Sequence, residues 1–84
     1  MTPIQDLLNR IRWDQAFADA DFSVGYYDRP SGRIIMVPFR SLYFPEESHA
    51  AFELVDEEGR VHSIPFHRVR RILRNGVLIW ERQP

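Results

Sequence analysis

The side chains best suited to binding an anion are concentrated between residues 60 and 84. This segment holds six arginines and one acid, Glu81, whereas residues 1–59 hold five arginines and eleven acids. The chain has no lysine, and guanidinium forks hold phosphates through paired hydrogen bonds and stack on bases better than ammonium groups do. A GC-rich genome would also enrich arginine, so the inference depends on the clustering. The pattern favours an anion that carries a planar ring, such as a nucleotide end.

Two short groups of residues combine the side chains that such a ligand needs. The first is Tyr27-Asp28-Arg29, and the second is His67-Arg68. Both groups place an arginine next to a ring or a hydrogen-bonding group, which suits a phosphate attached to a nucleoside. We expect them to face each other across a β-sheet. Together they are the candidate binding site.

Templates for catalysis match the sequence poorly. The four glycines are isolated from one another, which does not fit a phosphate-cradling glycine loop. A zinc site needs three or four clustered ligands, but the chain has no cysteine and only His49, His62 and His67. Acid–base chemistry by His67, with or without His62, stays open as an alternative, because nearby arginines favour a neutral imidazole. No metal or cofactor is expected.

Length and composition predict a single cytoplasmic domain spanning residues 1–84. A chain of 84 residues that is 44% hydrophobic has enough apolar side chains for one core and no room for two. The absence of cysteine excludes a disulfide framework. No apolar run approaches the length of a membrane span, and the N-terminus lacks a signal pattern, so no membrane partner is expected.

The first segment predicts a helix over about residues 3–13. Thr2 is a suitable N-cap, Pro3 suits the first helical position, and Gln5 could complete a capping box. One apolar stripe follows at helical spacing and must pack on another element, and it consists of Ile4, Leu7, Leu8 and Ile11. Trp13 is expected to extend this stripe as a core anchor, and Asp14 to cap a second short turn.

Alternating patterns and turn residues predict three β-hairpins. The six strands are expected at about 22–28, 33–38, 50–56, 60–65, 69–74 and 77–82. Phe22, Val24 and Tyr26 alternate onto one face of the first strand. Asn75-Gly76 is the favoured pair for a type I′ turn.

A two-residue turn at Asn75-Gly76 fixes the pairing of the last hairpin. Regular pairing would place Ile72 opposite Ile79 and Arg71 opposite Trp80. Residues 40–49 show no clear hydrophobic pattern and are expected to form mainly a loop, with a short strand at 41–44. The predicted fold is therefore α+β, with one N-terminal helix packed on a small curved antiparallel sheet or partial barrel of five to six strands.

The block from Ile64 to Val69 (IPFHRV) is the most specific of several motifs in the chain. The others are Arg12-Trp13-Asp14, Tyr27-Asp28-Arg29, Gly76 and Trp80-Glu81-Arg82. Their order and spacing, over roughly residues 3–82, resemble the DUF504 / UPF0248 family, also called the MJ1316 RNA cyclic group end recognition domain. The resemblance implies recognition of RNA 3′ ends with a 2′,3′-cyclic phosphate during RNA repair or processing. It also implies partners such as RNA ligases, phosphoesterases or nucleotidyltransferases.

Carried onto this chain, the resemblance points to seven binding residues: Tyr27, Asp28, Arg29, His67, Arg68, Trp80 and Arg82. Arg29 and Arg68 would hold phosphate oxygens, and His67 would donate to the cyclic phosphate. A tyrosine or Trp80 would stack on the terminal base. The expected function is a non-catalytic RNA-binding module. The alternatives are a protein-interaction scaffold and a small phosphoesterase that uses His67.

Overall fold

The N-terminal helix α1 (Ile4–Trp13) buries the predicted aliphatic stripe in the core. The computed structural model describes residues 3–83. Pro3 is extended and precedes the helix, and its carbonyl accepts a hydrogen bond from the Leu7 N–H at 3.2 Å. Its predicted place as the first helical residue is therefore wrong by one position. Thr2 and the capping box predicted with it lie outside the described residues.

Trp13 is not the core anchor that the sequence suggested, because 72% of its side chain is exposed. The helix explains this result, since Trp13 lies about 200° around the helix axis from Ile11 and so faces away from the buried stripe. The prediction that Asp14 caps a second short turn is confirmed. Asp14 caps the short helix α2 (Gln15–Ala18), and its carboxylate accepts from the Phe17 N–H at 3.2 Å.

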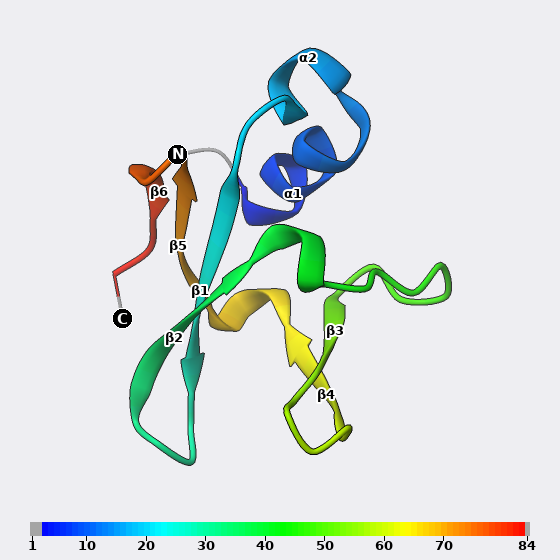
Figure 1. Cartoon of the computed structure of the whole chain (residues 1–84), viewed down its shortest axis with the longest axis vertical. Helices are drawn as coiled ribbons and strands as arrows, with labels where there is room; N and C mark the ends of the chain where they lie inside the picture. Colours follow the sequence, from blue (N-terminus) through cyan, green and yellow to red (C-terminus); the bar gives the residue numbers. More distant parts are fainter. Residues whose placement is uncertain (1–2, 84) are drawn as a thin grey trace.

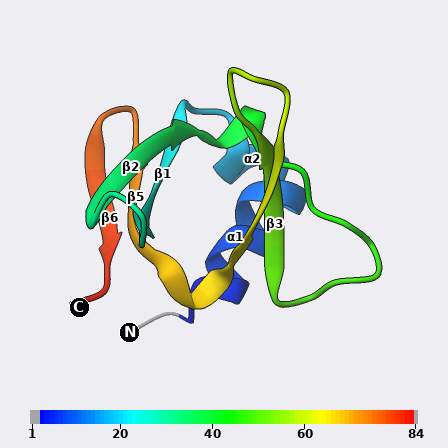
Figure 2. The same cartoon turned by 90° about the horizontal axis from the view of Figure 1, so that it is seen from below.

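All six predicted strands are present, in two antiparallel sheets (Figure 1). A four-stranded sheet has the order β2-β1-β5-β6, with the strands β1 (Phe22–Asp28), β2 (Arg33–Pro38), β5 (Val69–Arg74) and β6 (Val77–Glu81). A separate two-stranded sheet joins β3 (Ala51–Val55) to β4 (Val61–Pro65). Figure 2 shows α1 between the four-stranded sheet and this hairpin. The α+β class is confirmed, and the strands described in residues 3–83 do not close into a barrel.

The turns of the last two hairpins form where the sequence predicted them. Asn75 and Gly76 both have positive φ, 50° and 80°, as a type I′ turn requires. The Asn75 main chain and side chain also make two hydrogen bonds to the Asp21 main chain, at 2.6 and 2.9 Å. Gly59, at φ 82°, closes the turn between β3 and β4. The glycines thus stand where a side chain would strain the backbone.

Two β-bulges change the predicted pairing of β5 with its neighbours. Against β1, Gly25 pairs with Arg71 and Tyr26 with Val69, so Arg70 is the extra residue. Against β6, Ile72 pairs with Trp80 and Leu73 with Leu78, so Ile79 is the extra residue. The pairings predicted for Ile72 with Ile79 and for Arg71 with Trp80 are therefore wrong. The bulges allow Val69, Ile72 and Trp80 to enter the core together.

The region between β2 and β3 supports the core through its phenylalanines rather than as a strand. A short 3-10 helix, η1 (Phe39–Ser41), is followed by a single bridge between Tyr43 and Glu53. The short strand predicted at 41–44 is thus reduced to this bridge. The Phe44 ring centroid lies 6.0 Å from that of Phe52 and 6.3 Å from that of Phe66. This cluster joins β3 to the second 3-10 helix, η2 (Phe66–Arg68).

Candidate nucleic-acid interface

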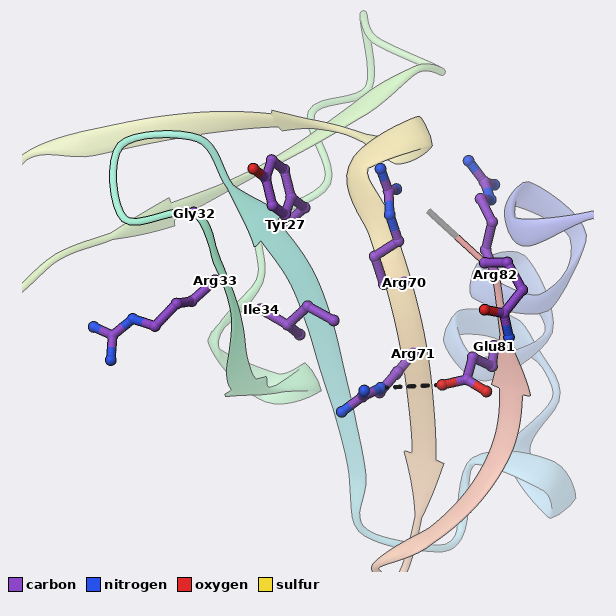
Figure 3. Close-up of a pocket in the computed structure, with 9 residues that line it drawn as sticks. Tyr27, Gly32, Arg33, Ile34, Arg70, Arg71, Glu81 and Arg82 are labelled. Carbon is purple, nitrogen blue, oxygen red and sulfur yellow. Dashed lines mark hydrogen bonds and ion pairs between the residues drawn. The ribbon is translucent and has the colours of Figure 1, made fainter.

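A pocket of about 600 Å³ lies between the β1–β2 turn and the adjacent ends of β5 and β6 (Figure 3). It has one aromatic ring, four arginines and a single acid on its walls. Its lining residues are Tyr27, Gly32, Arg33, Ile34, Arg70, Arg71, Glu81, Arg82 and Gln83. We call it the arginine pocket. Its excess of cations over acids suits an anionic ligand.

The bulge in β5 explains why neighbouring arginines line the same pocket. In a regular strand Arg70 and Arg71 would point to opposite faces of the sheet. The extra residue at Arg70 interrupts this alternation, so Val69 and Ile72 turn inward while Arg70 and Arg71 both line the pocket. Gly25, opposite Arg71, is buried, and a Cβ there would lie 2.6 Å from the Met36 sulfur. The glycine therefore lets β2 and β5 side chains pack closely over β1.

The arginines of the pocket differ in how far their charge is compensated. The Arg71 Nε donates to the Glu81 Oε2 at 3.2 Å, which forms an ion pair. By contrast, the Arg70 and Arg82 Nη1 atoms both donate to the His67 carbonyl oxygen, at 2.6 and 2.9 Å. This acceptor carries no net charge, and within residues 3–83 neither arginine forms an ion pair. The structure therefore holds two cationic groups in place without neutralising them.

Arg70 lies between Arg82 and the Tyr27 ring in Figure 3, and the Arg70 and Arg82 side chains extend in the same direction. The Arg70 guanidinium is 5.8 Å from the Tyr27 ring centroid, within the range of a cation–π contact. The Tyr27 side chain is 36% exposed. Because both nitrogens reach the same carbonyl oxygen, the two guanidinium groups are close enough to contact one phosphate. A base could stack beside them on Tyr27.

The seven predicted binding residues are only partly brought together. Tyr27 and Arg82 line the arginine pocket, and the His67 carbonyl accepts hydrogen bonds from two of its lining residues, Arg70 and Arg82. Arg29 and Arg68 are not among the lining residues, and Trp80 is only 7% exposed. Of these two rings, Tyr27 is therefore the one exposed enough to stack on a ligand.

Asp28 has a local structural role at the edge of the pocket. Its carboxylate accepts from the Ser31 N–H at 3.2 Å, and its carbonyl accepts from the Gly32 N–H at 2.8 Å. These bonds shape the β1–β2 turn, whose Gly32 and Arg33 line the pocket. Burial raises the pKa of the neighbouring Tyr26 hydroxyl, and the Asp28 carboxylate raises it further. Tyr26 is therefore a neutral core residue rather than a titrating site residue.

Arg33, Arg70 and Arg71 were not identified as site residues from the sequence. Arg33 could have been recognised from the first hairpin, because its turn pairs Arg33 with Asp28 beside Tyr27. The convergence of Arg70 with Arg82 had no such signal. It depends on the bulge and on the position of the His67 carbonyl at the end of η2.

His62 does not join His67 in a common site. Its ring nitrogen lies 2.7 Å from the Asp56 Oδ2, in the β3–β4 hairpin. His67 instead lines a second pocket together with His49. Across residues 3–83 no three potential metal ligands come close enough together to hold an ion. Among the described residues, the histidines therefore form neither the His62–His67 pair that stayed open as an alternative nor a cluster that could hold a metal.

The His62–Asp56 contact predicts an acid-sensitive contribution to stability. The hydrogen bond from His62 and the Arg60 N–H lower the pKa of Asp56 from its ordinary value of 3.8. A lowered carboxyl pKa stabilises the fold above pH 3.8, and this contribution disappears as the pH falls through the folded-state value. We expect urea unfolding of Asp56→Asn, measured from pH 7 to 2.5, to show a smaller loss of stability in acid. Parallel pH profiles for the two proteins would contradict this.

The fold and the pocket together define a class of protein: a small α+β domain with an arginine-lined pocket. The chain belongs to the MJ1316 RNA cyclic group end recognition domain family, whose sequence model matches residues 1–82. The predicted family is thus confirmed, and its description indicates binding to RNA. No solved structure matches the chain. None of the helices described in residues 3–83 is long and apolar enough to cross a membrane.

Proposed function

We propose that the protein binds RNA 3′ ends that carry a 2′,3′-cyclic phosphate and does not process them. The observation that carries this proposal is the pair of arginines, Arg70 and Arg82, held on the His67 carbonyl beside Tyr27. In this arrangement the two guanidinium groups bind the non-bridging oxygens of the cyclic phosphate, and the terminal base stacks on Tyr27. Family membership supports the same ligand.

The charge distribution favours recognition of an end over binding along the backbone of long RNA. The whole chain has a formal net charge of −1, so it gains little from general attraction to phosphates. Its uncompensated cations at the arginine pocket nevertheless form a local positive site. A local site of this kind suits a single terminal phosphate.

Titration of the protein with short RNAs that differ only at the 3′ end tests the proposal. The three ends are a 2′,3′-cyclic phosphate, a 3′-phosphate and a free hydroxyl. We expect the cyclic end to bind most tightly and the hydroxyl end most weakly, and the cyclic RNA to be recovered intact. Equal or absent binding of all three would refute RNA-end recognition. Conversion of the cyclic end to a monophosphate, lost in His67→Ala, would establish the phosphoesterase alternative.

The same proposal places the protein in cytoplasmic RNA repair or processing. A non-catalytic module must pass the bound end to an enzyme, and the enzymes that act on such ends are ligases, phosphoesterases and nucleotidyltransferases. Arg29, His67 and Arg68, which do not line the arginine pocket, stay candidates for contacts with that enzyme or with the RNA beyond the pocket. Formation of a ternary complex with cyclic-phosphate RNA and such an enzyme, detected by gel filtration, is the expected result. An enzyme that excludes the module from the RNA would contradict it.

A further inference from the structure

We propose that the RNA site continues beyond the terminal nucleotide along three adjoining pockets and takes a single-stranded 3′ segment of about three nucleotides. The inference rests on the proposed function in one respect, because that function places the terminal nucleotide in the arginine pocket. It rests independently on two neighbouring pockets and on the exposed Trp13, for which folding gives no reason.

The second pocket shares Arg82 with the arginine pocket, so the two are neighbours on the surface. It has a volume of about 400 Å³ and combines an apolar floor with two imidazoles. Its lining residues are Pro3, Ile4, Gln5, His49, Ala50, Phe66, His67 and Arg82. Phe66 has one face against the core, where its ring stacks on Phe52 at 6.2 Å. An apolar floor with imidazole edges suits a nucleobase, and Arg82 lies where the phosphate between two nucleotides would pass.

The third pocket shares His49 with the second, so the three pockets follow one another. Its volume is about 390 Å³, and it lies between the end of α1 and the loop before β3. Its lining residues are Asn9, Arg12, Trp13, Pro45, Glu46, Ser48 and His49. Each of the three pockets therefore contains an aromatic ring and a basic side chain. That repeating pair is the feature by which proteins bind single-stranded nucleic acid.

Trp13 is the strongest evidence that the RNA site extends as far as the third pocket. We call the row of three pockets the track. With 72% of its side chain exposed, it contributes little to the core. The Arg12 guanidinium lies 4.9 Å from the Trp13 ring and 4.5 Å from the Phe44 ring, so it links the exposed ring to the buried aromatic cluster. An exposed indole held by a guanidinium is a ready stacking surface for a base.

The charged residues along the three pockets predict how each nucleotide contributes to binding affinity. Arg70 and Arg82 make the terminal position depend on its phosphate. Glu46 lines the third pocket and opposes phosphate binding there, so stacking on Trp13 must carry that position. The third nucleotide should therefore add affinity with little preference for a particular base. The strand runs with its 3′ end at Tyr27 and its 5′ side at Trp13.

Affinity as a function of RNA length tests the track. The ligands are a nucleoside 2′,3′-cyclic phosphate and RNAs of two, three and five nucleotides with the same cyclic end. We expect affinity to rise up to the third nucleotide and then level off. Trp13→Ala should weaken binding of the trinucleotide by about five- to tenfold and leave the mononucleotide unaffected. The matched control is Tyr43→Ala, which removes another exposed aromatic ring (62% exposed) outside the three pockets and should change neither affinity.

Equal affinity for all four lengths, or a trinucleotide affinity unchanged by Trp13→Ala, would overturn the track. The proposed function fails separately. If the mononucleotide binds and that binding requires Arg70, while added nucleotides give no gain, end recognition stands and the track is wrong. If no cyclic end binds at any length, both are wrong. Circular dichroism spectra matching wild type would confirm that Trp13→Ala, at the exposed end of α1, leaves the fold intact.

Discussion

Replacing Arg70 with alanine is expected to weaken binding of cyclic-phosphate RNA by about 10- to 100-fold. A hydrogen bond to a charged group contributes roughly 1.5–3 kcal/mol, which corresponds to this range of dissociation constants. Arg70 is the central group of the arginine pocket, because it contacts both the Tyr27 ring and the His67 carbonyl. Its removal therefore takes away a phosphate ligand and one support of the stacking ring. Fluorescence anisotropy with a labelled RNA measures the effect.

The chain offers a matched control for this substitution on the same strand. Arg74 also lies in β5, but its guanidinium is stacked 5.0 Å from the Phe17 ring and does not line the arginine pocket. Arg74→Ala makes the same change in net charge, so general attraction to RNA falls equally in both variants. We expect Arg74→Ala to change affinity less than about threefold. Similar losses in the two variants would mean that RNA is held by overall charge and not by the pocket.

Arg70→Lys separates the geometry of the guanidinium from its charge. Lysine keeps the positive charge but lacks the planar fork that donates to a carbonyl and a phosphate at once. We expect it to recover less than half of the free energy lost in Arg70→Ala. Full recovery would show that any cation at this position suffices. Arg82 keeps its bond to the His67 carbonyl in both variants, which preserves the end of η2.

The parts of the fold that local patterns control could be predicted from the sequence. Helical spacing identified the buried stripe of α1, and alternation identified the buried face of β1, with Phe22, Val24 and Tyr26. Asn75-Gly76 located the last hairpin because few other residue pairs accept two positive φ angles. In each case neighbouring residues carry all the information that the conformation needs.

The bulges at Arg70 and Ile79 could not be predicted in this way, and the candidate site depends on them. Strict alternation treats a strand as regular, whereas these bulges arise because Val69, Ile72 and Trp80 must all be buried in one core. That requirement comes from the packing of three strands and α1. The sequence therefore pointed to Tyr27 and His67 but did not reveal that Arg70 and Arg71 share a face. The exposed position of Trp13 could have been predicted from the sequence, because helical spacing alone directs its side chain away from Ile11.

Replacing Phe52 with alanine is expected to reduce the free energy of unfolding by about 3–5 kcal/mol. A domain of this length has a total stability of roughly 4–13 kcal/mol, so the loss would be a large share of it. Phe52 is fully buried, and its ring lies 6.0 Å from Phe44 and 6.2 Å from Phe66. The variant leaves a cavity at the centre of this cluster. Urea unfolding followed by tryptophan fluorescence measures the change.

The position of Phe52 makes this substitution a test of how the two sheets depend on each other. A two-stranded sheet has little stability alone, and the β3–β4 hairpin buries only Phe52 and Ile64 among its described residues. Phe52→Ala should therefore loosen the hairpin from α1 and the four-stranded sheet, whereas Tyr43→Ala, which removes an exposed ring beside β3, should cost less than about 0.5 kcal/mol. A loss below about 1 kcal/mol in Phe52→Ala would mean that the cluster repacks around the cavity. The hairpin leads directly into η2, so its attachment also holds the His67 carbonyl on which Arg70 and Arg82 converge.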